Sequence, residues 1–225
     1  MTRIVLVNAV YFKGVWNQKF DPRFTNQADF YVTPDKTVKV PMMFQRGTFR
    51  VSEYSKFQKF KCSMIELPYE GKKVVMQLIL PNKNVDISEI EGKLDNLASS
   101  FAESSSEMSA MVRLPKFKIA QEIDLKEPLT GLNQNMNDLF EGNPDFSNMV
   151  KKAQLSISKA VQKVFIEVNE EGSEAAAATA VVIRQRSGFR GFRFNANRPF
   201  IFLIRDTITG LVLFQGRIVD PTVEE

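Results

Sequence analysis

The stretch VNEEGSEAAAATAVV, which runs from Val168 to Val182, is the most unusual part of this 225-residue sequence. After Gly172 it contains almost only small side chains, followed by β-branched ones up to Ile183. Alanine favours helices, and Ser173 followed by an acid is typical of a helix start. An isolated helix this short is marginal in water, and Val-Val-Ile prefers strands. The composition therefore leaves two interpretations open, an alanine helix or a mobile loop that can become a strand.

The residues on either side of this stretch differ sharply in character. Val161–Val168 has the apolar, β-branched pattern of a strand. Downstream, five arginines and no acid fall between Arg184 and Arg198. Unpaired guanidinium groups cannot be buried, so this segment must be largely exposed. It is typical of a polyanion or nucleic-acid patch, or of a segment presented to proteases that cut after arginine.

The rest of the chain predicts a mixed α and β fold. Arg3–Phe12 is almost continuously apolar, which favours a strand buried on both faces. Cys62–Leu67 and Lys73–Leu80 form a hairpin pattern, and Asp86–Phe101 has helical spacing with Asp86 as its cap. Further expected elements are the strands Ala28–Val32, Val38–Met43, Thr48–Tyr54, Met111–Leu125, Ile201–Ile204 and Leu211–Ile218, the helices Lys126–Leu132 and Asn137–Phe140, and turns at 33–35 and 46–47. The sequence has no internal repeat and no clear linker, so we expect one domain over residues 1–225.

Composition excludes several function classes. The chain has no histidine, which removes a Ser-His-Asp unit and the usual zinc ligands. The single cysteine, Cys62, lies between apolar residues, so we expect a buried, inert thiol. Glu170 and Glu171 are adjacent and would point to opposite faces of a strand. No apolar run approaches the ~20 residues that span a bilayer. We expect no enzyme activity, cofactor, metal or membrane span.

Blocks along the whole chain resemble the serpin family, in the family's order. VNEEGSEAAAATAVV resembles the proximal hinge of the reactive loop in inhibitory serpins, which typically runs Glu-Glu-Gly-Thr-Glu-Ala-Ala-Ala-Ala-Thr. Ser173 stands where threonine is usual. The other blocks are LVNAVYFKGVW (Leu6–Trp16), VKVPMM (Val38–Met43), ELPY (Glu66–Tyr69), FNANRPFIFLI (Phe194–Ile204) and FQGRIVDP (Phe214–Pro221).

The resemblance implies an α+β serpin fold with large, mainly antiparallel sheets and a reactive centre loop at 172–194. It implies a serine protease inhibitor that acts as a suicide substrate, whose cleaved loop inserts into the large sheet. The family's spacing places the reactive bond at Arg186–Ser187, which suits a trypsin-like protease. Alternative cleavage residues are Arg184, Arg190 and Arg193. The hinge residues are Glu171, Gly172, Ser173, Glu174, Ala175, Ala176, Ala177, Ala178 and Thr179. A charge within the hinge, such as Ala176→Arg, should prevent insertion.

The resemblance also implies a latch that keeps the sheet closed. Inhibitory serpins usually have a histidine in the strand before the hinge, held through an asparagine on the neighbouring strand. Here Gln162 and Asn8 stand at those positions, near the family's tryptophan, Trp16. Glutamine can donate and accept hydrogen bonds, so the latch can survive the change.

Other implications concern the extent and setting of the chain. The family's N-terminal helices and two sheet strands precede the region matched here, so we expect a C-terminal portion, and a truncated product would be poorly stable and non-inhibitory. A non-inhibitory serpin-fold binding protein is the alternative, but such relatives commonly carry bulky, charged or proline residues where this chain has Ala175–Ala178. A polyanion such as heparin is a second expected partner, and nucleic acid is not. We expect an extracellular protein, with an intracellular one left open, and the sequence suggests an arthropod source.

Overall fold

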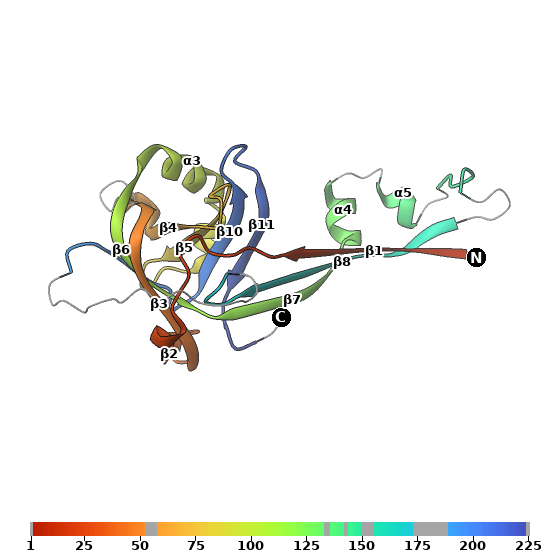
Figure 1. The fold of residues 1–225 in the computed structure, drawn as a ribbon. Coiled ribbons are helices and arrows are strands. Elements are labelled where there is room, and N and C mark those ends of the chain that lie inside the picture. The colour runs from red at the N-terminus through yellow and green to blue at the C-terminus, as the bar shows by residue number, and fades with distance from the viewer. Residues whose placement is uncertain are drawn as a thin grey trace. The chain divides into compact units, whose positions relative to one another are not determined.

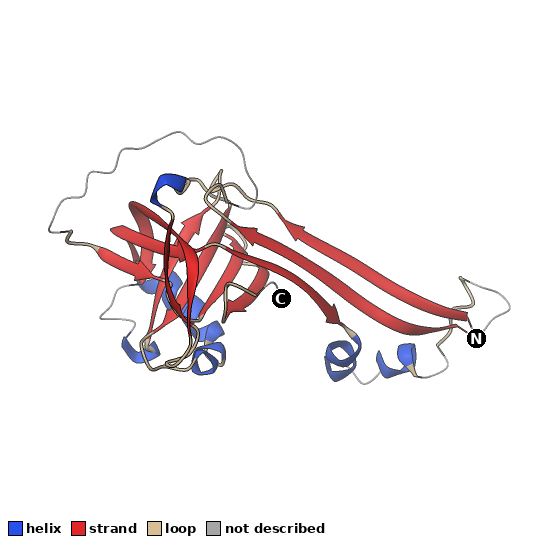
Figure 2. Ribbon diagram, turned by 90° about the horizontal axis from the view of Figure 1, so that it is seen from below, coloured by secondary structure: helices blue, strands red, loops and turns tan. Residues whose placement is uncertain are grey.

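The computed structural model describes residues 2–52, 58–132, 136–141, 144–149, 155–172 and 189–223. The chain forms two compact units. The first, which we call the three-stranded unit, comprises residues 1–12 and 118–166 together with the terminal residue 225. The second, the eight-stranded unit, comprises residues 13–117 and 167–224. Strands dominate both units and the helices are short (Figure 2), in agreement with the predicted α+β class.

The three-stranded unit is a sheet with the order β1-β8-β7 (Figure 1). Its strands are β1 (Thr2–Phe12), β8 (Leu155–Val168) and β7 (Phe117–Asp124). The helices α4 (Lys126–Leu132) and α5 (Asn137–Phe140) have the predicted bounds. They lie on one face of the sheet, where Leu129 and Phe140 pack with Ile157 and Ala160 of β8. Strands β1 and β8 run parallel and pair directly.

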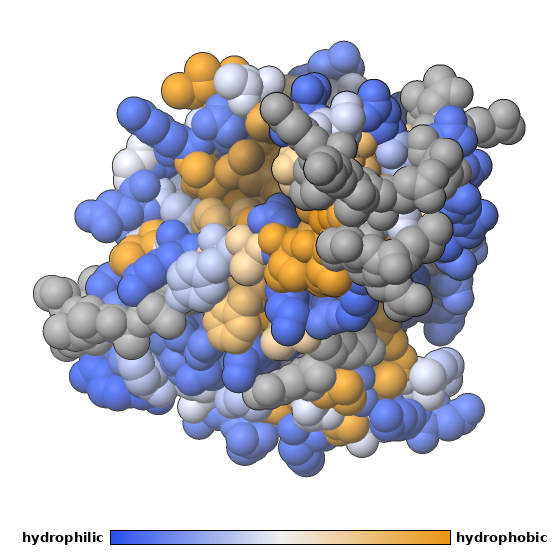
Figure 3. All heavy atoms as spheres, turned by 90° about the vertical axis from the view of Figure 1, so that its right-hand side faces the viewer, coloured by the Kyte–Doolittle hydropathy of each residue, from blue (hydrophilic) through white to orange (hydrophobic). Residues whose placement is uncertain are grey.

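Strand β1 is confirmed as a strand, but its predicted burial on both faces is wrong. Val5 is 57% exposed, Leu6 49% and Val7 64%. Within the described residues β8 is its only strand neighbour, and the helix cluster reaches β1 only at Ile4. An apolar pattern therefore specifies a strand without specifying what covers it. Hydrophobic side chains also come to the surface on the face of the molecule that Figure 3 shows.

The eight-stranded unit has the strand order β11-β10-β5-β4-β3-β6-β9, with β2 paired to β3. Among the described residues of this unit, neighbouring strands pair antiparallel except for β6 and β9, which run parallel. The strands are β2 (Asn26–Tyr31), β3 (Thr37–Ser52), β4 (Cys62–Pro68), β5 (Val74–Pro81), β6 (Ser105–Pro115), β9 (Phe192–Asn195), β10 (Phe200–Asp206) and β11 (Val212–Ile218). Two short 3-10 helices are η1 (Pro22–Phe24) and η2 (Gln58–Phe60).

Two strand predictions are corrected by pairing. The turn expected at Arg46–Gly47 is absent, because β3 continues through it and pairs with β6 without interruption. The single strand predicted over Met111–Leu125 is instead β6, which begins at Ser105, followed by β7. Pro115 has no backbone N–H to donate, and β6 ends there. The predicted hairpin of β4 and β5 is confirmed.

The helix predicted over Asp86–Phe101 is two helices, α2 (Ile87–Glu91) and α3 (Leu94–Ser104). Asp86 caps α2 as expected, since its carboxylate accepts a hydrogen bond from the Ser88 backbone N–H at 2.8 Å. The break falls at Gly92, where glycine is a poor helix former.

One hydrophobic cluster of this unit lies where α2 and α3 cover β4, β5 and β10. Its buried residues are Phe60, Cys62, Met64, Ile79, Ile90, Leu97, Phe101, Ile201 and Leu203. Cys62 is buried, as predicted, and burial raises the pKa of its thiol to about 12, which disfavours the reactive thiolate. Among the described residues no helix is long and apolar enough to cross a bilayer, and no cluster of acids and cysteine suits a metal.

Candidate functional site

The described residues contain both ends of the segment 172–194. Gly172 follows β8 at one end, and Phe189 to Phe194 lead into and form β9 at the other. The reactive bond Arg186–Ser187, the alternative Arg184 and the hinge residues 173–179 lie outside the described residues. The structure therefore describes the candidate site at its two ends, around Gly172 and around residues 189–194.

The first end is fixed to the eight-stranded unit by a turn after β8. The Asn169 backbone N–H donates to the Gly172 carbonyl at 3.0 Å, which closes the turn. The Trp16 N–H donates to the Glu171 carbonyl at 2.9 Å, and Val15 forms an antiparallel bridge with Gly172. We call Val15, Trp16 and Asn169–Gly172 the loop anchor. It fixes the backbone of Asn169–Gly172 against Val15 and Trp16.

Trp16 is the centre of the loop anchor. Its side chain is only 2% exposed and stacks on the Tyr69 ring, with centroids 4.4 Å apart. The Phe20 ring meets it edge-on at 6.2 Å. Its indole Nε1–H donates to the Asn169 carbonyl at 2.9 Å. Buried indole N–H groups need such a partner, so the turn and the aromatic cluster stabilise each other.

Gly172 is required by both conformation and space. Its φ is +130°, a conformation that side chains rarely adopt. A β-carbon there would lie 2.1 Å from the Gly14 carbonyl oxygen and 2.7 Å from the Val15 Cα. Both atoms are backbone, so neither can move aside cheaply. The resemblance singled out Gly172, and the close backbone approach gives the physical reason.

Glu170 and Glu171 lie in the turn after β8, beyond the end of the strand. The Glu170 carboxylate lies 2.9 Å from Lys116 Nζ and accepts a hydrogen bond from the Thr25 hydroxyl at 2.8 Å. The Glu171 carboxylate lies 2.6 Å from Lys19 Nζ. Burial tends to raise the pKa of Glu170, but the hydrogen bonds from Lys116 and Thr25 outweigh burial and hold that pKa below its usual range.

The depressed pKa of Glu170 makes a pH-dependent prediction. We expect Glu170→Gln to lower the free energy of unfolding at neutral pH by about 1 kcal/mol. Because the folded pKa is depressed, this contribution is present above the ordinary glutamate pKa of about 4.3 and is lost as the pH falls through the folded value. Urea unfolding of both proteins at pH 7, 5 and 3 should show the difference shrinking toward acid. A constant difference would mean that the charge of Glu170 does not stabilise the anchor.

The predicted latch residues Asn8 and Gln162 belong to the three-stranded unit. They stand directly opposite each other in the parallel register of β1 and β8. Asn8 is exposed and Gln162 half-buried. The third latch residue, Trp16, belongs to the loop anchor described above.

The second end of the segment is fixed by β9. Arg193 lies on β9 opposite Met111 of β6, and its side chain is exposed. Arg190 is also exposed, and the neighbouring Phe189 ring lies 4.5 Å from the Arg46 guanidinium. A β-carbon at Gly191 would lie 2.5 Å from the Ser109 carbonyl oxygen. Residues 189–195 are thus held against β3 and β6.

Comparison with known proteins identifies the whole chain. A family model described as Serpin (serine protease inhibitor) matches residues 1–221. The chain belongs to the serpin family. Antitrypsin of Bombyx mori is 39% identical to this serpin over 97% of the chain and 55% of its own length. Antichymotrypsin-2 of the same species is 41% identical over 96% of the chain and 56% of its own length.

Solved structures agree on the fold. A serpin from the trematode Schistosoma haematobium matches with a TM-score of 0.81 and 23% identity, over 96% of this chain and 56% of its own. This serpin chain therefore spans about half the length of the relatives it matches. The family is one of protease inhibitors and not of enzymes.

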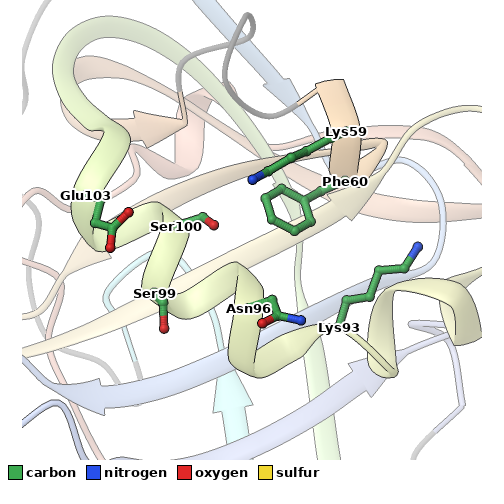
Figure 4. Close-up of a pocket in the computed structure, with 7 residues that line it drawn as sticks. All are labelled: Lys59, Phe60, Lys93, Asn96, Ser99, Ser100 and Glu103. Atoms are coloured by element: carbon green, nitrogen blue, oxygen red, sulfur yellow. The ribbon is translucent and has the colours of Figure 1, made fainter.

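A pocket of about 470 Å³ lies on this serpin between α3 and η2 (Figure 4). Lys59, Phe60 and Ser100 face one another there, with Lys59 Nζ 4.8 Å from the Phe60 ring centroid. Lys93 and Glu103 also line it, so its charge is mixed. Nothing in this arrangement selects a polyanion, and the heparin-like partner stays a prediction.

Proposed function

We propose that the protein carrying this chain inhibits trypsin-like serine proteases as a suicide substrate, with Arg186–Ser187 as the reactive bond. The observation that carries the proposal is the pairing of β1 with β8. These strands run parallel and are direct neighbours, and the small-residue segment leaves from the end of β8.

The direction of the chain favours insertion between these two strands. A segment that turned back after Gly172 and lay between β1 and β8 would run antiparallel to both. One parallel ladder would be replaced by two antiparallel ladders, which are slightly more stable per residue. The antiparallel bridge of Val15 with Gly172 has the same direction and would be the first rung of one ladder. Small side chains at 175–180 would enter with little displacement of packed neighbours.

The residue at the reactive bond favours a trypsin-like target. A guanidinium pairs with the buried carboxylate of a trypsin-like specificity pocket. The two silkworm relatives are named for trypsin and for chymotrypsin and are about equally similar to this chain, so overall similarity does not select the target. Arg193 is the weaker alternative, because a protease cleft needs a free extended backbone and β9 is already paired with β6. We also propose an extracellular setting, by inference from the family.

Incubation of the protein, as it is isolated, with trypsin tests this function. We expect an SDS-resistant one-to-one complex and a cut after Arg186 in the mass map. Arg186→Ala should slow inhibition by about a thousandfold, because a site built to pair a guanidinium rejects a substrate that lacks it. Arg190→Ala is the matched control and should change the rate little. Cleavage without a stable complex would favour the non-inhibitory binding protein, and a cut after Arg190 or Arg193 would refute the bond assignment.

A further inference from the structure

Three strands of the eight-stranded unit present arginines on one outward face. Arg46 of β3 pairs with Met111 of β6, which pairs in turn with Arg193 of β9. In the next row, Arg113 of β6 lies between Phe44 and Asn195. The intervening residues Gln45, Val112 and Phe194 are buried, so the arginines share the opposite, outer side. We call Arg46, Arg113 and Arg193, with Met111 between them, the arginine face.

The charge of the arginine face is not compensated by an acid in the part of the chain that the structure describes. Among the described residues, no carboxylate lies within 4.0 Å of these three guanidinium groups. Within β3, β6 and β9 the single acid is Glu107, which lies four register positions from Met111, opposite Arg50. Neighbouring strands are about 4.8 Å apart, so the three backbone positions fall within roughly 10 Å of one another. Like charges this close repel, and an anionic partner would relieve the repulsion.

Aromatic rings hold two of the guanidinium groups in place. The Arg46 guanidinium lies 4.5 Å from the Phe189 ring centroid, and that of Arg113 lies 5.9 Å from the Phe44 ring. Phe44 is itself met edge-on by Phe24 at 6.5 Å. Arginine, aromatic residues and methionine are the types enriched at protein–protein contacts. Ordering these side chains in advance lowers the entropy lost on binding.

The arginine face is continuous with the reactive loop. Arg186 and Phe192 are six residues apart, so the reactive bond lies at most about 21 Å from the start of β9. A protease of about 230 residues has a radius of gyration of about 17 Å. An enzyme that holds Arg186 in its cleft can therefore extend over or beside β9. Surface loops of the protease beside that cleft then come within reach of Arg193 and Arg113.

We propose that the arginine face is a second docking site for the target protease, and that it binds an acidic surface loop beside the protease's substrate cleft. This inference rests on the proposed inhibition and adds to it a selection among proteases that all cut after arginine. Arg193 then acts in attracting the enzyme and not as a cleavage point. Protein carboxylates are favoured over a sulfated polysaccharide because the arginines are few, stacked and interleaved with apolar side chains.

The test is the rate of inhibition of two Arg-specific proteases, one with acidic and one with basic loops beside its cleft. The variant Arg113→Glu/Arg193→Glu should slow association with the acidic enzyme about tenfold at low salt and flatten its salt dependence. It should leave the basic enzyme unaffected or faster. Lys83→Glu, at an exposed turn position after β5, is the control for net charge. The proposal would be overturned if, per unit of charge changed, Lys83→Glu slowed association with the acidic enzyme as much as the double variant does.

A binding measurement separates this inference from the proposed function. Each protease is prepared with its nucleophilic serine replaced by alanine, so that it binds without reacting. Weaker binding of the acidic enzyme to the double variant supports the arginine face even if the active enzyme forms no covalent complex. Unchanged binding, with the covalent complex intact, refutes the face and leaves inhibition standing. Loss of retention on a heparin column with unchanged protease binding would make the face a polyanion site and would also refute the proposal.

Discussion

Ala177→Arg should turn the proposed inhibitor into a substrate, raising the inhibitor molecules consumed per protease inactivated by about tenfold or more. If the antiparallel register of the Val15–Gly172 bridge continues along β1, Ala177 comes opposite Val10. Val10 shares its face with Ala160 and Ile166 of β8, both of which are buried. A guanidinium on that face loses much of its hydration, which costs several kcal/mol and slows insertion. The acyl-enzyme then has time to hydrolyse.

The matched control is Ala176→Arg, the position that the sequence alone had suggested. In the same register Ala176 comes opposite Tyr11, which is 48% exposed. That face of β8 also carries the exposed side chain of Lys163, so a charge is tolerated there. We expect near-normal stoichiometry for this variant, measured by titration of residual protease activity. Equal behaviour of the two variants would contradict strand insertion in this register, since adjacent residues of a strand point to opposite faces.

Local sequence patterns predicted where helices and strands form. Pairing with residues distant in sequence determined how far some strands extend and how exposed they are. The bounds of α4 and α5, the β4–β5 hairpin and the Asp86 cap depend on neighbouring residues, and all were predicted correctly. Arg46–Gly47 has the local character of a turn, yet β3 crosses it because β6, over fifty residues away in sequence, supplies continuous partners. The exposure of β1 likewise depends on what packs against it and not on its own composition.

The candidate site was found by resemblance, but its physical basis was not visible in the sequence. The resemblance named Asn8 and Gln162, and the register of β1 and β8 places them opposite each other, while their role as a latch stays a prediction. The contacts of Glu170 with Lys116 and of Glu171 with Lys19 join residues that no local pattern connects. The arginines near the end of the chain are likewise grouped by strand pairing with residues that are distant in sequence.

Sequence proximity grouped Arg193 with Arg184, Arg186, Arg190 and Arg198 as one exposed cluster. Strand pairing groups it instead with Arg46 and Arg113, which come from distant parts of the chain. Arg198 leaves the cluster altogether, because its guanidinium donates to the Pro81 carbonyl at 2.6 and 2.8 Å. A charge count along the sequence therefore did not identify the surface on which those charges act.

Trp16→Ala should lower the free energy of unfolding of the eight-stranded unit by about 3–5 kcal/mol, the usual range for removing a fully buried tryptophan. The substitution removes the ring that stacks on Tyr69 and leaves the Asn169 carbonyl without its indole donor. Trp16→Phe keeps an aromatic ring and loses mainly the hydrogen bond, so its effect should be nearer 1–2 kcal/mol. Trp16 is the single tryptophan, so unfolding must be followed by circular dichroism and not by tryptophan fluorescence.

The two variants separate the contributions of packing and hydrogen bonding to the loop anchor. If the stacked ring holds the anchor, Trp16→Ala should also speed hydrogen exchange at the Glu171 and Gly172 amides, while Trp16→Phe should leave it slow. If both variants lose equal stability, the indole hydrogen bond to Asn169 is the main contribution, and the aromatic cluster does not hold the turn. If neither changes exchange at the hinge, the anchor depends on the backbone pairing of Val15 and Gly172, and Trp16 stabilises only the core around it.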